Sequence, residues 1–458
     1  MTSPRVVVLV DGEHHPSVVR AAVDDLRSRG VTVVGAAMLG GGEKLAPGDV
    51  PDLGVAVVDG SGPLDALTRA LDRFDASIVV DLSDDPVLDA RTRALLAAHA
   101  LARGLTYRGA DVEVTPPPRP RLCKKPSIAV VGTGKRTGKT AVAQALARAL
   151  RTAGTEPVIV TMARGGPPRP ELVDPRETDL TLAALLRRAA SGQHAASDHL
   201  EDALAAGVAA IGTRRCGGGV AGTPAFDEFA AGVALANQRR EGLVVLEGSG
   251  RAIPPVHADV TVCVVPAGAD PDLVTGHVGV VALLLSDVVL VTLGAEPGRA
   301  GLVPSQRATP SRARELESRV RAVVPGVPVV TGSLRPVPLE PLAARNVFLA
   351  TTAPDGAMPS IARQLERDAG AVVVGWTTNL GNRDRLRGDL VDLRGADVLV
   401  TEIKGAGVDT AARLAAERGM DVVFLRHDVD LHGESIATRA RALADLATQR
   451  FESGDARR

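Results

Sequence analysis

The stretch GTGKRTGKT, residues 132–140, stands between a run of apolar residues and a run of helix formers. The apolar run 128–131 predicts a buried strand, and residues 141–150 carry helix formers at helical spacing. Because the glycines lie where strand turns into helix, backbone N–H groups at the start of the helix are free to bind an anion, and the helix dipole adds to the attraction. The stretch therefore predicts a phosphate-binding loop.

Two side chains of this loop have the types that ATP binding needs. Lys139 can reach the β- and γ-phosphates, and the hydroxyl of Thr140 can bind Mg²⁺. We expect the whole loop to bind the nucleotide: Gly132, Thr133, Gly134, Lys135, Arg136, Thr137, Gly138, Lys139 and Thr140. The first glycine stands one residue earlier than usual, a spacing that resembles the loop of dethiobiotin synthetase and its relatives in the P-loop superfamily. An ordinary strand-to-helix turn is the alternative.

The composition bounds the partners of the chain. With 458 residues, two or three domains are expected. Lys and Arg number 53 and Asp and Glu 54, so no overall charge attracts the protein to nucleic acid or to an anionic membrane. One Trp, one Tyr and six Phe provide few surfaces on which bases could stack. We therefore expect neither a nucleic-acid partner nor a membrane partner.

Other features of the chain favour a cytoplasmic location. The three cysteines, at 123, 216 and 263, form no CxxC pair, which indicates neither a zinc site nor a disulfide framework. The first residues resemble a strand rather than a signal peptide. The apolar segment 277–295 contains Asp287, which would lie in the middle of a bilayer, so we predict a helix followed by a buried strand there.

Strands alternate with helices along most of the chain, which predicts an α/β fold with doubly wound, mainly parallel sheets. We expect a Rossmann-like N-terminal domain over residues 1–111, a proline-rich linker over 112–126 and a P-loop NTPase-like domain over 127–340. Within this P-loop domain, we expect residues 299–311 to form a loop. Residues 341–458 form a further α/β region, which is either a separate domain or a completion of the central sheet.

A carboxylate follows one of the predicted buried strands. Glu247 ends the apolar run 243–246 and precedes Gly-Ser-Gly. Such a carboxylate, next to a phosphate-binding loop, can hold Mg²⁺ directly or through water. Thr140 and Glu247 are therefore the candidate metal ligands, the alternative for Glu247 being a carboxylate exposed in a surface loop.

Two segments combine arginine with glycine. Residues 163–170 follow a predicted strand, and residues 212–222, predicted as a loop, contain two arginines before three glycines. Guanidinium groups bind phosphate bidentately, and glycine lets backbone N–H groups approach an oxyanion. The candidate substrate-binding residues are Arg164, Arg169, Arg214, Arg215, Gly217, Gly218 and Lys404, the last of which follows a predicted strand. Of these, Arg164, Arg214 and Arg215 join Lys139 as candidate catalytic residues, and surface loops with incidental cations are the alternative.

Two further groups of polar residues have no assigned role. Asp198 and Glu201 have the spacing of a helix-capping pair, which we favour over a role as acid or base. Asp11, Glu13, His14 and His15 follow the first strand, and Asp81, Asp84 and Asp85 end a later strand of the same domain, so they are expected to face one another.

Together, the loop 132–140, the segments TMARGGP (161–167), RRCGGG (214–219) and LEGSG (246–250) resemble the cyclic 2,3-diphosphoglycerate synthetase family. The resemblance extends over most of the chain. It implies a cytoplasmic enzyme that uses ATP and Mg²⁺ to close a phosphoanhydride between the two phosphates of 2,3-diphosphoglycerate, with release of ADP and phosphate. The substrate would be a small polyanion.

Two other functions stay open at this stage. One is a kinase that acts on a phosphoglycerate or another small anionic acid. The other is a nucleotide-switched maturation or partitioning protein, although the chain has no Asn-Lys-x-Asp element for guanine. The oligomeric state is undecided, with a homodimer as one option.

Overall fold

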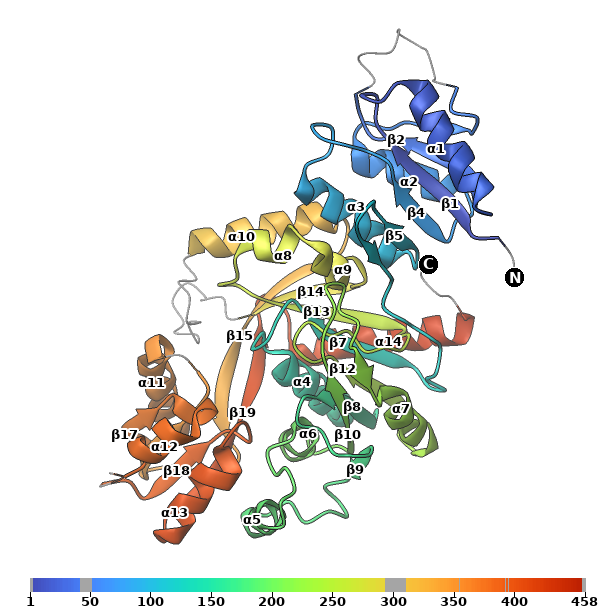
Figure 1. Ribbon diagram of the computed structural model, residues 1–458. Coiled ribbons are helices and arrows are strands. Elements are labelled where there is room, and N and C mark those ends of the chain that lie inside the picture. Colours follow the sequence, from blue (N-terminus) through green and yellow to red (C-terminus); the bar gives the residue numbers. More distant parts are fainter. Residues whose placement is uncertain are drawn as a thin grey trace.

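A computed structural model describes residues 3–41, 52–292, 310–353, 355–391, 393 and 395–454. The N-terminal domain lies to one side of a large central sheet, which the C-terminal residues extend (Figure 1). The predicted α/β class, with a P-loop sheet and an additional N-terminal α/β domain, is confirmed. The predicted loop 299–311 falls outside the described residues except for its last two, which begin a helix.

The N-terminal sheet has the strand order β3-β2-β1-β4-β5-β6, in which all pairs are parallel except the last. Its elements are β1 (Arg5–Val10), α1 (Pro16–Ser28), β2 (Thr32–Met38), β3 (Val57–Val58), α2 (Pro63–Arg73), β4 (Ile78–Asp81), α3 (Ala90–Ala102), β5 (Thr106–Arg108) and β6 (Glu113–Val114). The predicted linker begins too early in the sequence, because β6 pairs with β5 and so belongs to this sheet.

The central sheet has the order β11-β10-β8-β12-β7-β13-β14-β15-β19-β18-β16-β17 among the described residues, with β9 paired to β10. Its strands are β7 (Ser127–Gly132), β8 (Pro157–Ala163), β9 (Glu171–Val173), β10 (Ala210–Cys216), β11 (Phe226–Asp227), β12 (Leu243–Glu247), β13 (Val260–Pro266), β14 (Val288–Thr292), β15 (Val329–Pro338), β16 (Asn346–Ala350), β17 (Val372–Thr377), β18 (Val398–Thr401) and β19 (Asp421–Leu431). Strands β7, β8, β12, β13 and β14 are buried almost throughout, as unbroken apolar runs require when helices cover both faces.

Helices cover both faces of this sheet. Residues of one core cluster come from α4 (Lys139–Thr152), α5 (Leu182–Ala190), α6 (Asp198–Ala206), α11 (Met358–Ala369) and α14 (Ile436–Ser453). Residues of the opposite cluster come from α7 (Phe229–Gln238), α8 (Pro271–Thr275), α9 (Val281–Leu284) and α10 (Pro310–Val323), together with α3 of the N-terminal domain. Beyond these, α12 (Arg383–Asp389) and α13 (Arg413–Glu417) pack on the C-terminal strands.

Strand β15 joins the C-terminal region to the P-loop region. It pairs in parallel with β14 on one side and antiparallel with β19 on the other. The strands β16 to β19 therefore extend the central sheet, which answers the question that the sequence left open.

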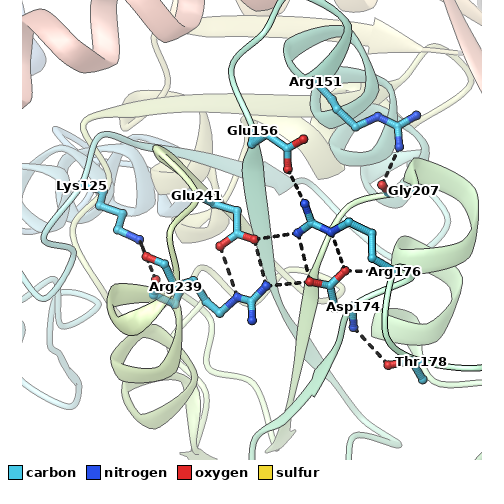
Figure 2. A network of polar contacts seen from close by, with 10 residues as sticks. Lys125, Arg151, Glu156, Asp174, Arg176, Thr178, Gly207, Arg239 and Glu241 are labelled. Atoms are coloured by element: carbon cyan, nitrogen blue, oxygen red, sulfur yellow. Dashed lines mark hydrogen bonds and ion pairs between the residues drawn. The ribbon is translucent and has the colours of Figure 1, made fainter.

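A network of ion pairs (Figure 2) lies at the amino-terminal edge of the sheet, where Asp174 follows the antiparallel strand β9 and Glu241 precedes β12. The buried carboxylates of Asp174 and Glu241 each contact both Arg176 and Arg239, at N–O distances from 2.6 to 3.2 Å. Lys125, which precedes β7, donates a hydrogen bond to the carbonyl of Ala236 (3.1 Å). These contacts therefore join the linker to the end of β9, the end of α7 and the start of β12.

Candidate active site

The phosphate-binding loop follows β7 and leads into α4, as predicted. A Cβ atom at Gly132 would lie 2.7 Å from Thr137 Oγ1 and 2.9 Å from the carbonyl oxygen of Val264, so only glycine fits. Gly138 has a φ of +94°, which suits glycine at the start of the helix. The loop therefore presents its backbone N–H groups at the carboxyl edge of the sheet.

The Lys139 side chain curls back over the loop. Its Nζ donates hydrogen bonds to the carbonyl of Gly134 (2.6 Å) and to Thr137 Oγ1 (3.2 Å). Burial lowers the pKa of Lys139 to about 8, against the opposing effect of the Glu247 carboxylate. A phosphate arriving in the loop would restore a strong partner to this buried ammonium group.

The two candidate metal ligands lie side by side. Thr140, in the first turn of α4, donates from Oγ1 to Glu247 Oε1 at the end of β12 (2.6 Å). Thr161 of the neighbouring strand β8 donates to the other carboxylate oxygen (3.2 Å). Burial, with the nearby Asp198 charge, raises the pKa of Glu247. A hydroxyl and a carboxylate are the donor set that Mg²⁺ takes beside nucleotide phosphates, so the residues present fit this ion.

A cavity of about 580 Å³ adjoins the phosphate-binding loop and shares Gly134 and Lys135 with it. Every charged residue that lines it is a cation: Lys135, Arg164, Arg215 and Arg251. None of the carboxylates in the described part of the chain forms an ion pair with these four. Gly217, Gly218 and Gly219 add exposed backbone to the lining. Such a set of unpaired cations suits a polyanion.

Arg164 and Arg215 converge on Gly250, whose added Cβ would lie 3.0 Å and 3.2 Å from their Nη2 atoms. Arg215 is almost buried and donates to the carbonyls of Gly217 (2.6 Å) and Ser249 (2.8 Å), while its buried Nε has no partner among the described residues. Burial and the neighbouring charge of Arg164 lower the pKa of Arg215. An anion in the cavity would therefore meet two guanidinium groups held close together.

Three of the predicted substrate-binding residues do not line this cavity. The first five residues of the segment predicted as a loop, 212–216, are in fact the end of strand β10, so Arg214 and Arg215 point to opposite faces of the sheet. Arg214 instead pairs with Glu228 through two contacts of 3.1 Å. Arg169 is exposed, and Lys404 forms an ion pair with Glu201 at 3.1 Å.

The interpretation of Asp198 and Glu201 as a helix-capping pair is wrong. Ser197 is the residue that precedes α6, and no side chain caps this helix end. Glu201 is buried and its partner is Lys404, which follows β18, about two hundred positions later in the sequence. The contact thus links the P-loop region to the C-terminal strands.

The polar residues of the N-terminal domain meet as expected at the carboxyl ends of β1 and β4. Asp11 Oδ2 accepts a hydrogen bond from the backbone N–H of Asp84 (2.7 Å). Its Oδ1 accepts from the N–H groups of Glu13 and His14 (both 3.0 Å) and contacts His14 Nδ1 at 2.8 Å. These bonds order the turn that leads into α1.

Sequence reasoning missed Arg251. It follows Gly250 directly in the loop after β12, and the carboxyl-edge position of that loop was the available signal. Only the folded chain shows that this loop shares a cavity with Arg215 of β10 and with the glycines that follow that strand.

The parallel sheet, the glycine-rich loop before α4 and the paired Thr140 and Glu247 define a P-loop nucleotide-binding protein. The chain belongs to the cyclic 2,3-diphosphoglycerate synthetase family. The P-loop domain of that family matches residues 127–330, its N-terminal domain residues 5–115 and its C-terminal domain residues 338–428.

Close relatives carry the same name. The cyclic 2,3-diphosphoglycerate synthetase of Rubrobacter xylanophilus is 42% identical over 93% of this chain and 94% of its own length. That of Thermococcus kodakarensis is 40% identical over 94% and 96%. Among solved structures, LpxK from Aquifex aeolicus in complex with ATP aligns with 73% of this chain and 90% of its own, at 15% identity and a TM-score of 0.41. The names of the two synthetase relatives do not favour the kinase and switch-protein alternatives.

No helix in the part of the chain that the structure describes is long and apolar enough to span a bilayer. The predicted helix and strand around Asp287 are confirmed as α9 and β14, at 281–284 and 288–292.

Proposed function

We propose that this protein is an ATP- and Mg²⁺-dependent synthetase that converts 2,3-diphosphoglycerate to its cyclic phosphoanhydride, with ADP and inorganic phosphate as the other products. The observation that carries this proposal is the cavity beside the phosphate-binding loop, whose charged lining residues are all cations. Its volume of about 580 Å³ suits a small molecule. The names of the relatives supply the identity of the substrate.

The charges explain why cyclisation needs such a cavity. Two phosphate dianions about 4 Å apart repel by roughly 4 kcal/mol even at the dielectric constant of water, and by more in a dry site. Arg164 and Arg215 hold the two phosphates together and offset this repulsion, while Lys135 adds a cation from the phosphate-binding loop itself. Catalysis is then mainly positioning and charge stabilisation.

The reaction proceeds in two displacements. An oxygen of one substrate phosphate takes the γ-phosphoryl group, and the bond between the β- and γ-phosphates breaks to give ADP. An oxygen of the other substrate phosphate then attacks the inner phosphorus of the new diphosphate, and inorganic phosphate leaves. Lys139 binds the β- and γ-phosphates during the first displacement. Thr140 and Glu247 would hold Mg²⁺, which when bound neutralises phosphate charge.

The test is to incubate the pure protein with Mg·ATP and 2,3-diphosphoglycerate and to follow the products by phosphorus NMR. We expect a cyclic product that retains two phosphorus atoms, together with one ADP and one phosphate per turnover. A product that gains a third phosphorus atom would identify a kinase instead. The Lys139→Ala variant serves as the control for contaminating activities.

A further inference from the structure

Arg251 is the one cation of the cavity that projects from the loop after β12, and its surroundings differ from those of the other three. Its Nη1 contacts Nε2 of His277 and lies 3.2 Å from the position that a Cβ of Gly279 would take. His277 and Gly279 belong to the short 3₁₀ helix η2 (Val278–Val280) and the residue before it.

Two N–H donors face the ring of His277. The backbone N–H of Gly279 points at Nδ1 (2.7 Å), and Nη1 of Arg251, which can only donate, lies at Nε2. Burial and the Arg251 charge lower the pKa of His277, which favours the neutral ring, and a hydrogen bond to the backbone of Leu273 acts in the opposite direction. A neutral imidazole has one unprotonated nitrogen, so in the tautomer that leaves Nε2 bare it accepts the hydrogen bond from Arg251 and holds the guanidinium group in place.

Helix η2 in turn rests on the N-terminal domain. Val278, next to His277, packs against the core of that domain, and α3 packs against both η2 and α9. At the start of α3, Arg91 forms an ion pair with Asp272 of α8 (3.0 Å), which Arg319 of α10 also contacts (2.7 Å). A continuous series of contacts thus joins the N-terminal domain, η2, His277, Arg251 and the cavity.

We infer that Arg251 is a further binding residue for a substrate phosphate, that His277 is its positioning residue, and that the N-terminal domain supports both through η2. This inference rests on the proposed function for the identity of the substrate. The interaction that it describes, and that can be measured separately, is the binding of a small diphosphate. It gives the N-terminal domain a part in forming the cavity, although none of the cavity's lining residues belongs to that domain.

Two variants separate the positioning role of His277 from a purely structural one. His277→Asn keeps an acceptor for the N–H of Gly279, since asparagine caps helix starts well, but its shorter side chain loses the contact with Arg251. Arg251→Ala removes the cation itself. Arg240→Ala is the matched control, because Arg240 is an exposed arginine at the opposite, amino-terminal edge of the sheet.

The measurement is the affinity for inorganic pyrophosphate by calorimetry, with Mg²⁺ and a non-hydrolysable ATP analogue filling the nucleotide site. We expect Arg251→Ala to weaken pyrophosphate binding about 10- to 100-fold, as the loss of a charge-assisted hydrogen bond does. His277→Asn should weaken it about 3- to 10-fold with an unchanged melting temperature, and should have no further effect in the Arg251→Ala background. Arg240→Ala and the affinity for the ATP analogue should not change.

Equal pyrophosphate affinities of wild type and Arg251→Ala would overturn the inference, whether or not 2,3-diphosphoglycerate is turned over. Additive effects of His277→Asn and Arg251→Ala would overturn the positioning role. Val278→Ala should also weaken pyrophosphate binding, and an unchanged value would remove the N-terminal domain from the inference. Turnover of 2,3-diphosphoglycerate is assayed separately, so a failure of the proposed function is distinguishable from each of these results.

Discussion

Replacing Arg215 and Arg214 one at a time tests the cation-lined cavity most directly, because these neighbours in sequence point to opposite faces of β10. Arg215 lines the cavity and is 7% exposed, with its two Nη atoms fixed by backbone carbonyls and its Nε unpartnered among the described residues. Arg214 is bound to Glu228 and lies over the ring of Phe226. The same substitution to alanine should therefore have very different effects.

The size of the difference follows from the contacts. A hydrogen bond from a charged group contributes about 1.5 to 3 kcal/mol, so Arg215→Ala should lower kcat/KM for 2,3-diphosphoglycerate about 10- to 150-fold. Arg214→Ala breaks a half-exposed ion pair worth about 0 to 1 kcal/mol, so the kinetic constants should change about fivefold at most. Arg215→Lys, which keeps the charge without the planar fork, should lie between wild type and Arg215→Ala.

The assay is ADP release with 2,3-diphosphoglycerate varied at saturating ATP, and then with ATP varied. The KM for ATP should stay near the wild-type value in both alanine variants. The reasoning is refuted if Arg214→Ala loses as much activity as Arg215→Ala, or if Arg215→Ala keeps the wild-type KM and kcat for the substrate.

Three further predictions concern other parts of the molecule. Lys139→Ala should lower kcat/KM for ATP about 100- to 1000-fold, and unaltered turnover would exclude the loop from the reaction. Glu247→Gln, which keeps the shape of the side chain, should raise the Mg²⁺ concentration for half-maximal activity about tenfold or more; equal Mg²⁺ titrations would refute its role as a ligand. Hydrogen bonds from Arg176 lower the pKa of Asp174 to about 2, against the effect of burial. The carboxylate should therefore stabilise the fold by about 2 kcal/mol above pH 4, a contribution lost as the pH falls from 4 to 2. Urea unfolding of Asp174→Asn should show this loss in full at pH 7, about half of it at pH 3 and little of it at pH 2, whereas the exposed Asp179→Asn should be milder throughout.

The sequence predicted the strands that are buried on both faces, because unbroken valine-rich runs leave few other structures open to them. It missed β10 and β15 for a physical reason. The end of β10 carries Arg214 and Arg215, and β15 contains Pro336 and Pro338, so neither has the pattern of a buried strand. Both segments form strands because they pair with neighbouring strands of the sheet.

Some residues of the candidate site could likewise be predicted from the sequence, and others could not. The phosphate-binding loop and Glu247 depend on local sequence and on the edge of the sheet where strands end, so they could be predicted. The partner of Glu201 lies far away in the sequence, and the closeness of Arg251 to the other cations depends on how loops pack. Local spacing carries no information on either.

Helix α14, near the end of the chain, packs directly on α4, the helix that begins at Lys139. Arg450 fastens it there, with Nη1 donating to the carbonyl of Asp259 (2.7 Å) and Nη2 paired with Asp287 (2.9 Å). During translation, some three hundred residues must be synthesised after α4 before α14, which covers its apolar side, leaves the ribosome. A nascent chain that stalls before Ile436 should therefore fail to fold into a form that binds nucleotide. The uncovered apolar side of α4 would then be a surface to which a chaperone binds.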